Sequence, residues 1–227
     1  MREIVLDTET TGLDPFTGDR IVEIGAVELF NHMPTGETYH QYINPERDMP
    51  AGAFAVHGLS IEFLSDKPVF ASIAQEFLDF IQDSRLIIHN ASFDMKFLNA
   101  ELDWCSHPKI PMPQALDTLA IARKKFAGAQ NSLDALCRRF GIDNSSRTLH
   151  GALLDSEILA EVYLELIGGR QPDFALKVVH SSSASSPSGD YTPPARPRPL
   201  ASRTTAEESA AHETFIKELG GETLWER

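Results

Sequence analysis

The sequence predicts one mixed α/β domain followed by a C-terminal arm. Three apolar, strand-like segments open the chain, at Glu3–Leu6, Ile21–Phe30 and Thr38–Ile43. Another apolar run and several segments with helical spacing of apolar residues follow. Residues 180–205 are rich in Ser, Pro, Ala and Arg and have no apolar period, which is typical of a flexible linker. Strands therefore come first, strand and helices second, and the arm last.

The first three strands are joined by short turns. Turn-forming residues fill Thr11–Pro15 and Asn31–Gly36, and connections of this length favour an antiparallel meander. We predict a loop from Pro45 to Gly58. A helical pattern that extends to Ile81 then opens at Ser60 or Ser65.

The second half of the domain alternates one strand with helices. The run Arg85–His89 predicts a central strand, and Asn90 or Ser92 can cap the helix that follows it. Further helices are expected at Leu116–Phe126, at Ser132–Phe140, which ends at Gly141, and at Ala152–Ile167. A short helical pattern returns at Ala206–Leu219.

Composition sets the broad class of protein. The chain has 227 residues and a formal net charge of −13, which argues against nucleic-acid binding by a broad basic surface. Cys105 and Cys137 lack metal-type spacing, and this predicts a reducing compartment. No signal pattern and no apolar run of membrane length is present, so we expect a cytoplasmic protein without a membrane partner.

Two acids stand at the end of the first strand. Side chains alternate between faces along a strand, so Asp7 and Glu9 project to the same side. Two adjacent carboxylates at the end of an apolar run repel each other and resist desolvation. A pair of divalent metal ions would offset that repulsion.

Two more aspartates are predicted to point inward from helices. Asp94 and Asp155 each share a helix face with apolar residues three and four positions later. Each alone could be a capped or hydrogen-bonded structural acid. Together with Asp7 and Glu9 they favour a site for two hard cations about 3.5–4 Å apart, the arrangement used in phosphodiester hydrolysis.

His150 is the predicted proton acceptor. Gly151 separates it from the last helix, so we expect His150 to lie in the approach to that helix and to reach over the site. Histidine titrates near neutrality and can take a proton from water. The alternative is a helix-entry residue bonded to backbone.

These residues resemble the three motifs of DEDD-superfamily exonucleases of the histidine subtype. The motifs are Asp7-Thr8-Glu9, Asn90–Asp94 and His150–Asp155, and the resemblance covers residues 1–170. Flanking segments are similar to the proofreading exonucleases of bacterial DNA polymerase III: Val56–Leu59, Asn131–Cys137 and Arg147–Leu149.

The resemblance implies fold, activity and residue roles. The fold would be ribonuclease H-like, with a mixed sheet of about five strands flanked by helices and a flexible C-terminal tail. The activity would be 3′→5′ hydrolysis at a single-stranded or frayed DNA end, with release of nucleoside monophosphates. Two Mg²⁺ or Mn²⁺ ions would be held by Asp7, Glu9, Asp94 and Asp155, with His150 as general base.

The resemblance also implies contacts to the terminal nucleotide. His57 matches a position that touches it, and Asp7, Glu9, Thr10 and Asp155 belong to the same expected substrate site, with the backbone at Thr10 and Thr11 lining the pocket. Some relatives have an acid five residues before this histidine. Here that position is Gly52, which puts the corresponding contact in doubt.

Other polar residues are assigned structural places. We predict that Asp117 and Asp134 cap helices, and that Cys105 and Cys137 are small core residues. The pairs Lys124-Lys125 and Arg138-Arg139 could touch DNA phosphates, but a solvated helix face is the preferred interpretation.

The tail offers binding segments that an acidic domain would need. Residues 1–170 contain 14 Lys and Arg against 25 Asp and Glu, so this exonuclease domain should hold DNA weakly by itself. Residues 171–176 resemble a peptide that docks on the sliding clamp, and residues 206–227 resemble a segment that binds the polymerase (alpha) subunit. Residues 177–205 would be the linker between them.

Two other functions remain open at this point. One is an RNA-trimming exonuclease of the same superfamily, whose members generally lack such a tail. The other is a silent scaffold that only bridges clamp and polymerase, against which the retained acids and His150 argue.

Overall fold

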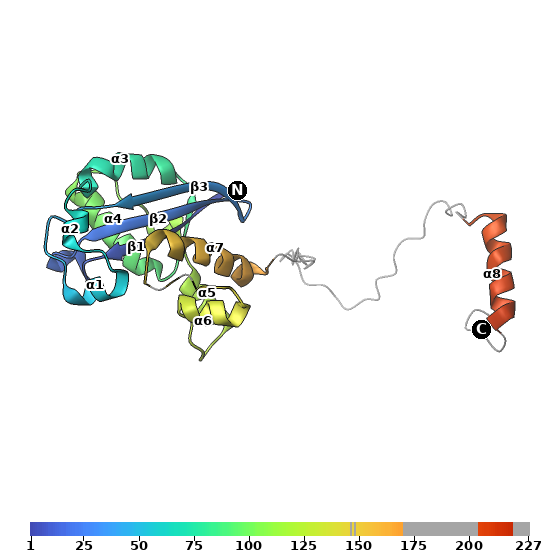
Figure 1. Ribbon diagram of the computed structural model, residues 1–227. Coiled ribbons are helices and arrows are strands. Elements are labelled where there is room, and N and C mark those ends of the chain that lie inside the picture. The colour runs from blue at the N-terminus through green and yellow to red at the C-terminus, as the bar shows by residue number, and fades with distance from the viewer. Residues whose placement is uncertain (146, 148, 170–203, 220–227) are drawn as a thin grey trace, which may run out of the picture. The chain divides into compact units, whose positions relative to one another are not determined.

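The computed structural model describes residues 1–145, 147, 149–169 and 204–219 (Figure 1). The chain divides into two units, Met1–Ala175 and Leu176–Arg227, each of which is described by itself. The predicted clamp peptide at 171–176 and residues 177–203 of the predicted linker lie outside the described residues, as do residues 220–227.

The first unit is built on a mixed five-stranded sheet. Its strands are β1 (Arg2–Thr10), β2 (Ile21–Phe30), β3 (Met33–Tyr42), β4 (Arg85–Ile88) and β5 (Ala115–Asp117), in the order β3-β2-β1-β4-β5. The β1–β2 and β2–β3 pairs are antiparallel, which confirms the meander, and β4 is parallel to both β1 and β5. The expected mixed sheet is confirmed.

Helices cover both faces of the sheet. On one face, α3 (Phe70–Ile81) and α4 (Ala91–Trp104) pack against Ile4 and Leu6 of β1. On the other face, α7 (Ala152–Ile167) packs against Val5 through Leu159 and Tyr163. Because strand side chains alternate, β1 is buried on both sides and reads as a continuous apolar run until Asp7.

A smaller core joins three helices beside the sheet. Side chains of α5 (Thr118–Lys125) and α6 (Leu133–Phe140) pack against Ile158, Val162 and Leu166 of α7 (Figure 1). The predicted end of α6 is confirmed, since Gly141 adopts the left-handed conformation there with φ of 70°. The predicted helix Ala152–Ile167 is also confirmed.

The predicted loop at Pro45–Gly58 is wrong, because α1 (Ala51–His57) forms within it. Pro50 supplies an extended N-cap and Gly58 a left-handed C-cap. The following helical segment is not continuous: Ser60 caps a single turn, α2 (Ile61–Leu64), and α3 begins only after Val69. Most of α1 is exposed, which is why no apolar period marked it.

Other local features differ from prediction. β3 begins at Met33, since it pairs with β2 from its turn onward. Residues 115–117, expected to lie mostly in a helix, form β5 because β4 offers a parallel edge. Asn90 occupies the N-cap of α4, yet it is left-handed and makes no capping bond. Short 3₁₀ turns at Pro15–Thr17 and Met112–Gln114 were not predicted.

The second unit contains α8 (Ala206–Leu219), which confirms the helical pattern there. A reciprocal capping box starts it: the Glu208 backbone N–H donates to Thr205 Oγ1, and the Thr205 N–H donates to Glu208 Oε2 at 2.8 Å. Among the described residues, no helix has both the length and the apolar character needed to cross a membrane.

Candidate nuclease active site

β1 delivers the first two carboxylates. Asp7 lies opposite Gly25 of β2, and Glu9 lies opposite Glu23. Both are near the end of β1, before its pairing with β2 shifts at Thr10. Glu9 is buried and Asp7 is half-buried. As the alternation predicted, the intervening Thr8 points to the other face, where it meets α4.

α4 carries the third carboxylate inward. Asp94 is 3% exposed in the first turn of the helix, where it accepts a hydrogen bond from Thr8 Oγ1 at 2.7 Å. Burial raises the pKa of Asp94 to about 7, although that hydrogen bond opposes the shift. The predicted inward orientation of Asp94 is confirmed.

The β1 acids are also held in an environment that disfavours their charge. Burial raises the pKa of Glu9 to about 8, and the charges of Asp155 and Glu23 act in the same direction. The pKa of Asp7 rises well above its ordinary value through burial and then through repulsion from Asp94 and Glu9. This part of the site carries more negative charge than its surroundings compensate.

α7 delivers the fourth carboxylate with cations beside it. Asp155 is 2% exposed in the first turn of α7. Arg147 Nε donates to its Oδ1, and Arg147 Nη2 donates to its Oδ2 at 2.7 Å. Burial pushes the pKa of Asp155 upward, but the hydrogen bonds from His150 and Arg147 prevail and the pKa is lowered.

Gly25 allows α7 to reach the β1 acids. A Cβ at Gly25 would overlap the backbone of Ala152 and Leu153, so the start of α7 lies directly against β2 at this point. Ser156 Oγ donates to the Gly25 carbonyl at 2.9 Å and fixes the contact. The glycine is the cross-strand partner of Asp7, so the contact sets Asp155 close to Asp7.

His150 lies in the approach to α7, as predicted. Its backbone N–H donates to the Val56 carbonyl at 3.1 Å, and its Nδ1 is 3.3 Å from Asp155 Oδ2. The ring is largely exposed. One ligand atom each from Glu9, His150 and Asp155 lies within 4.8 Å of the others, a grouping that can hold a metal ion.

One hollow of about 290 Å³ opens over these groups. Asp7, His150 and Asp155 line it, together with Arg147, Asp134 and Leu159. Glu9 lies close to His150 and Asp155, and the charge of Asp94 raises the pKa of Asp7. The predicted acids and histidine therefore converge from β1, α4 and α7.

Sequence reasoning noted Arg147 only within a flanking segment similar to the family and did not predict its place in the site. Its side chain is 8% exposed, and besides Asp155 it contacts Asp134 at 2.9 Å and His150 Nδ1 at 2.7 Å. No local period marks this residue, since its partners come from α6 and α7. An arginine just before a histidine in an acid-rich chain was the available signal.

The predicted nucleotide-contact residues lie nearby. His57, 5% exposed at the end of α1, accepts from the Leu59 N–H at its Nδ1, and burial lowers its pKa. In the described part of the chain, His57 Nε2 has no hydrogen-bond partner. Thr10 Oγ1 donates to the Gly12 carbonyl, and Thr11 Oγ1 accepts from the Arg20 N–H. Gly52 is exposed in α1.

The predictions for the residues assigned structural places are partly confirmed and partly wrong. Asp117 caps α5 by accepting from the Leu119 N–H at 2.9 Å, as predicted. Asp134 is not a cap, because Ser132 caps α6 and Asp134 instead pairs with Arg147 and Asn144. Cys137 is fully buried, and Cys105 packs against the larger core from its edge.

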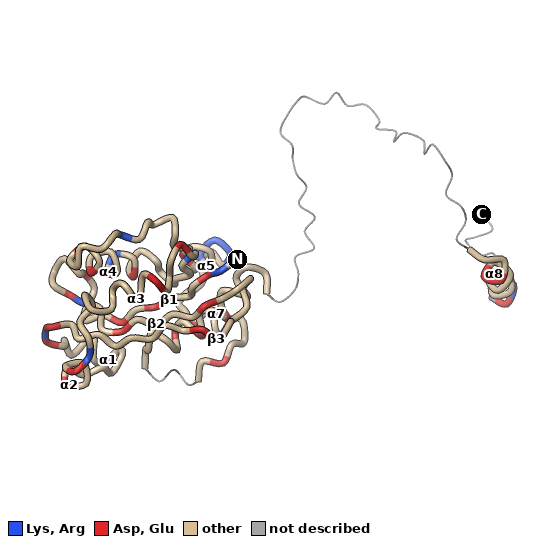
Figure 2. Tube along the Cα trace, turned by 90° about the horizontal axis from the view of Figure 1, so that it is seen from above, with Lys and Arg blue, Asp and Glu red and all other residues tan. Residues whose placement is uncertain are grey.

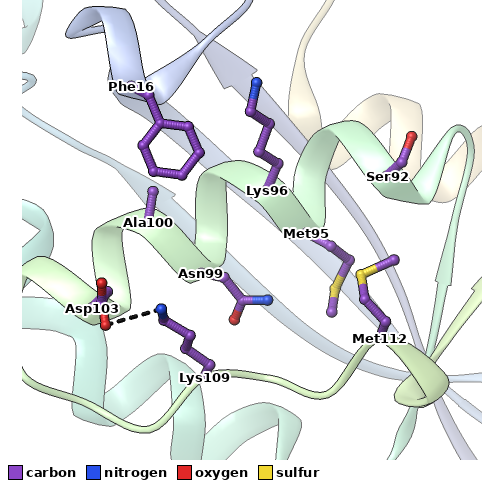
Figure 3. A pocket seen from close by; sticks show the side chains of 9 residues that line it. All are labelled: Phe16, Ser92, Met95, Lys96, Asn99, Ala100, Asp103, Lys109 and Met112. Carbon is purple, nitrogen blue, oxygen red and sulfur yellow. Dashed lines mark ion pairs between the residues drawn. The ribbon is translucent and has the colours of Figure 1, made fainter.

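A second hollow, of about 400 Å³, runs along α4 and contains none of these acids (Figure 3). Its two lysines are paired: Lys109 with Asp103 at 3.1 Å and Lys96 with Asp14 at 2.9 Å. Phe16 and Met112 form its apolar rim.

Known proteins resemble this chain closely in sequence. The exonuclease family model RNase_T matches residues 4–163. A Rickettsia felis protein named DNA polymerase III subunit epsilon is 51% identical over 225 residues, covering 96% of this chain and 97% of its own. The Escherichia coli protein of the same name is 44% identical, covering 99% of this chain and 97% of its own.

Solved structures share the fold. Exonuclease X in complex with 5′ overhanging duplex DNA matches with a TM-score of 0.57 and 25% identity, over 73% of this chain and 90% of its own. The nuclease domain of 3′hExo, described as a DEDDh family member bound to rAMP, matches with a TM-score of 0.63 and 18% identity, over 73% and 91% of the two chains.

Proposed function

From the premise that the chain belongs to the exonuclease family RNase_T, we propose that it proofreads DNA by two-metal hydrolysis in the hollow lined from β1, α6 and α7. The protein is a 3′→5′ exonuclease of DNA replication. Its proposed substrate is a mispaired 3′-terminal nucleotide, released as the monophosphate. The convergence of Asp7, Asp94 and Asp155 from three separate elements is the observation that carries the proposal.

Asp7, Glu9, Asp94 and Asp155 are the proposed ligands of two Mg²⁺ or Mn²⁺ ions. Family membership implies dependence on divalent metal. The donor set fits hard cations, because it consists of carboxylate oxygens, and the raised pKa values of Glu9 and Asp94 express a deficit of positive charge. Bound ions supply Lewis-acid activation of the attacking water and stabilise the departing 3′-oxygen.

His150 is the proposed general base. Its exposed ring lies over the carboxylates, and the bond from its N–H to Val56 fixes the backbone from which the ring projects. From there the imidazole can take the proton of the attacking water and pass it to solvent. Arg147 Nη2 lies 2.7 Å from His150 Nδ1, so we assign it the role of orienting the ring.

His57 and Thr10 are the proposed contacts to the terminal nucleotide. His57 Nδ1 is held by the Leu59 N–H, which fixes the ring, and the Thr10 backbone acts on the same imidazole. Thr10 lies directly after Glu9, where the strand pairing shifts and backbone groups leave the ladder.

The tail is proposed to place the nuclease at the primer end. The relatives are named as subunits of DNA polymerase III, so association with a polymerase and DNA follows from the family. We assign contact with the alpha subunit to residues 206–227 and with the sliding clamp to residues 171–176. In support, α8 is a capped helix with Phe215 56% exposed.

A degradation assay tests the catalytic proposal. The purified full chain is given 5′-labelled DNA with a matched or a mispaired 3′ end, and RNA of the same sequence, with Mg²⁺, Mn²⁺ or EDTA. We expect stepwise shortening of mispaired DNA in both metals and none in EDTA. Faster shortening of RNA would favour the RNA-trimming alternative, and no shortening at all would favour the scaffold.

Deletions test the partner assignments. Removing residues 206–227 should abolish co-purification with the alpha subunit and leave clamp binding intact. Removing residues 171–176 should have the converse effect. An intact interaction after the matching deletion would contradict that assignment.

A further inference from the structure

Cations gather on one part of a strongly acidic domain. Residues 118–142 contain five Lys or Arg and one acid, whereas residues 1–170 contain 14 Lys and Arg against 25 Asp and Glu. The five form what we call the α5–α6 ridge: Arg123, Lys124, Lys125, Arg138 and Arg139. Blue segments lie beside α5 in Figure 2.

The ridge is open to solvent. All five side chains are exposed, and among the described residues none of the five takes part in an ion pair. Arg139 instead lies over the Phe126 ring, at 4.4 Å from its centroid. Cations in the last turns of α5 and α6 favour the helix dipoles. That preference does not explain why they lack acidic partners in so acidic a protein.

The ridge adjoins the catalytic hollow. A hollow of about 500 Å³ is lined by Arg123, Leu119, Asn131, His89 and Ser132. His89 and Ser132 also line the hollow over the carboxylates, so the two hollows adjoin at these residues. The small core beneath fixes α5 and α6 to α7, the helix that carries Asp155. The ridge and Asp155 are therefore parts of one packed unit.

We propose that the α5–α6 ridge binds the phosphates of a single DNA strand on the 5′ side of the bond that is cut. This inference rests on the proposed function and adds the surface that holds the rest of the strand. The carboxylates repel a polyanion, and bound ions offset only part of that charge. Unpaired cations beside the hollow supply the missing attraction.

Two substrates distinguish binding of the strand by the ridge from the chemistry of hydrolysis. Thymidine 5′-phosphate p-nitrophenyl ester has one phosphodiester and nothing on its 5′ side, whereas a single-stranded oligonucleotide has the full strand. We compare the wild-type full chain with Lys124→Gln/Lys125→Gln. A matched control, Lys67→Gln/Lys109→Gln, removes the same charge from lysines that are paired with Asp66 and Asp103.

For the ridge variant we expect KM on the oligonucleotide to rise about tenfold at low salt, with kcat retained and KM on the ester changed far less. Each lost phosphate contact should also reduce the slope of log affinity against log salt by about 0.7. Adding Arg138→Gln should increase both effects. Shortening the oligonucleotide to a dinucleotide should remove the difference between variant and wild type.

Three results would overturn the inference: an unchanged oligonucleotide KM, an equal rise for ester and oligonucleotide, or an equal rise in the control. A wild-type chain that hydrolyses neither substrate would instead contradict the proposed function. Circular dichroism of the variants shows whether a change reflects folding.

Discussion

The two halves of the carboxylate cluster solve the same electrostatic problem in opposite ways. The strand half, Asp7 and Glu9 together with Asp94, has its pKa values raised by burial and mutual repulsion. The helix half, Asp155, has its pKa lowered because Arg147 and His150 donate to it. Both halves are buried, so burial alone does not decide the sign.

This difference indicates where the protein depends on added cations. The strand half holds carboxylates whose charge Arg147 and the hydrogen bond from Thr8 offset only in part, which costs stability and favours divalent metal. The helix half already has an internal cation in Arg147. The cluster is therefore prepared to receive metal mainly on the β1 side, and its α7 side is held in shape by the protein itself.

The largest expected effect separates the halves by stability. Asp7→Asn and Asp155→Asn should each lower the rate on a single-stranded oligonucleotide at least about 1,000-fold, since each removes a proposed metal ligand. In EDTA, however, Asp7→Asn should raise the free energy of unfolding by about 1 kcal/mol, because it removes repulsion. Asp155→Asn should lower it by about 1–3 kcal/mol, because it disrupts the two charge-assisted hydrogen bonds that Arg147 donates to Asp155.

Urea unfolding in EDTA measures both changes. Shifts of the same sign for the two variants would show that the halves are electrostatically alike and would remove the contrast.

The contact at Gly25 should have the next largest effect. Gly25→Ala places a methyl group into the backbone of Ala152 and Leu153, which cannot yield as a flexible side chain could. We expect a loss of about 3 kcal/mol and, in folded protein, a rate about 100-fold lower, since a shift of α7 moves Asp155 away from Asp7. Gly52→Ala is the control, because nothing lies within 4 Å of its new methyl.

A stable, fully active Gly25→Ala enzyme would show that α7 does not depend on this approach. Its rate is measured on the same oligonucleotide after the folded fraction has been determined by unfolding.

Sequence reasoning reached the acids because each is locally anomalous. Asp7 and Glu9 interrupt an apolar strand, and Asp94 and Asp155 interrupt apolar helix faces, so their orientation follows from period alone. The same periods predicted the helix Ala152–Ile167. The mixed sheet was predicted from the resemblance of the three motifs to a known family.

What escaped prediction depends on partners that are distant in the chain. β5 has three residues and is a strand only because β4 offers a parallel edge. α1 is mostly exposed and has no buried stripe to reveal it. Arg147 matters because α6 and α7 bring Asp134 and Asp155 to it, and a hydrogen-bond network of that kind has no sequence period.

Dependence on pH should also separate the halves. For a carboxyl whose folded pKa is raised, the stabilisation is complete below the unfolded pKa and is lost as pH rises through the folded pKa. Because of Glu9 and Asp94, the free energy of unfolding in EDTA should thus fall as the pH rises from about 4.5 to about 8. The slope approaches about 1.4 kcal/mol per pH unit for each proton bound only in the folded state.

The contribution of Asp155 to the pH dependence has the opposite sign, because its folded pKa is lowered. Its stabilisation is present above the unfolded pKa and is lost as the pH falls below that value. Unfolding free energies at pH 3–9 in EDTA measure both limbs. Glu9→Gln should flatten the neutral limb and leave the acid limb unchanged. A neutral limb that persists in Glu9→Gln and in Asp94→Asn would place its cause elsewhere.

The smallest expected effect concerns how α1 supports the position of His150 in the helix half. Gly58 has φ of 72°, and an added Cβ would lie 2.6 Å from Leu149 Cδ1, beside the backbone bond from His150 to Val56. Gly58→Ala should cost about 1 kcal/mol in backbone strain. It should also lower the rate several-fold, because displacing Leu149 moves His150. Adding Leu149→Ala removes the overlap but not the strain, so the double variant should regain activity while staying less stable than wild type. A Gly58→Ala protein as fast as wild type would show that Arg147 and Asp155 position His150 without support from α1.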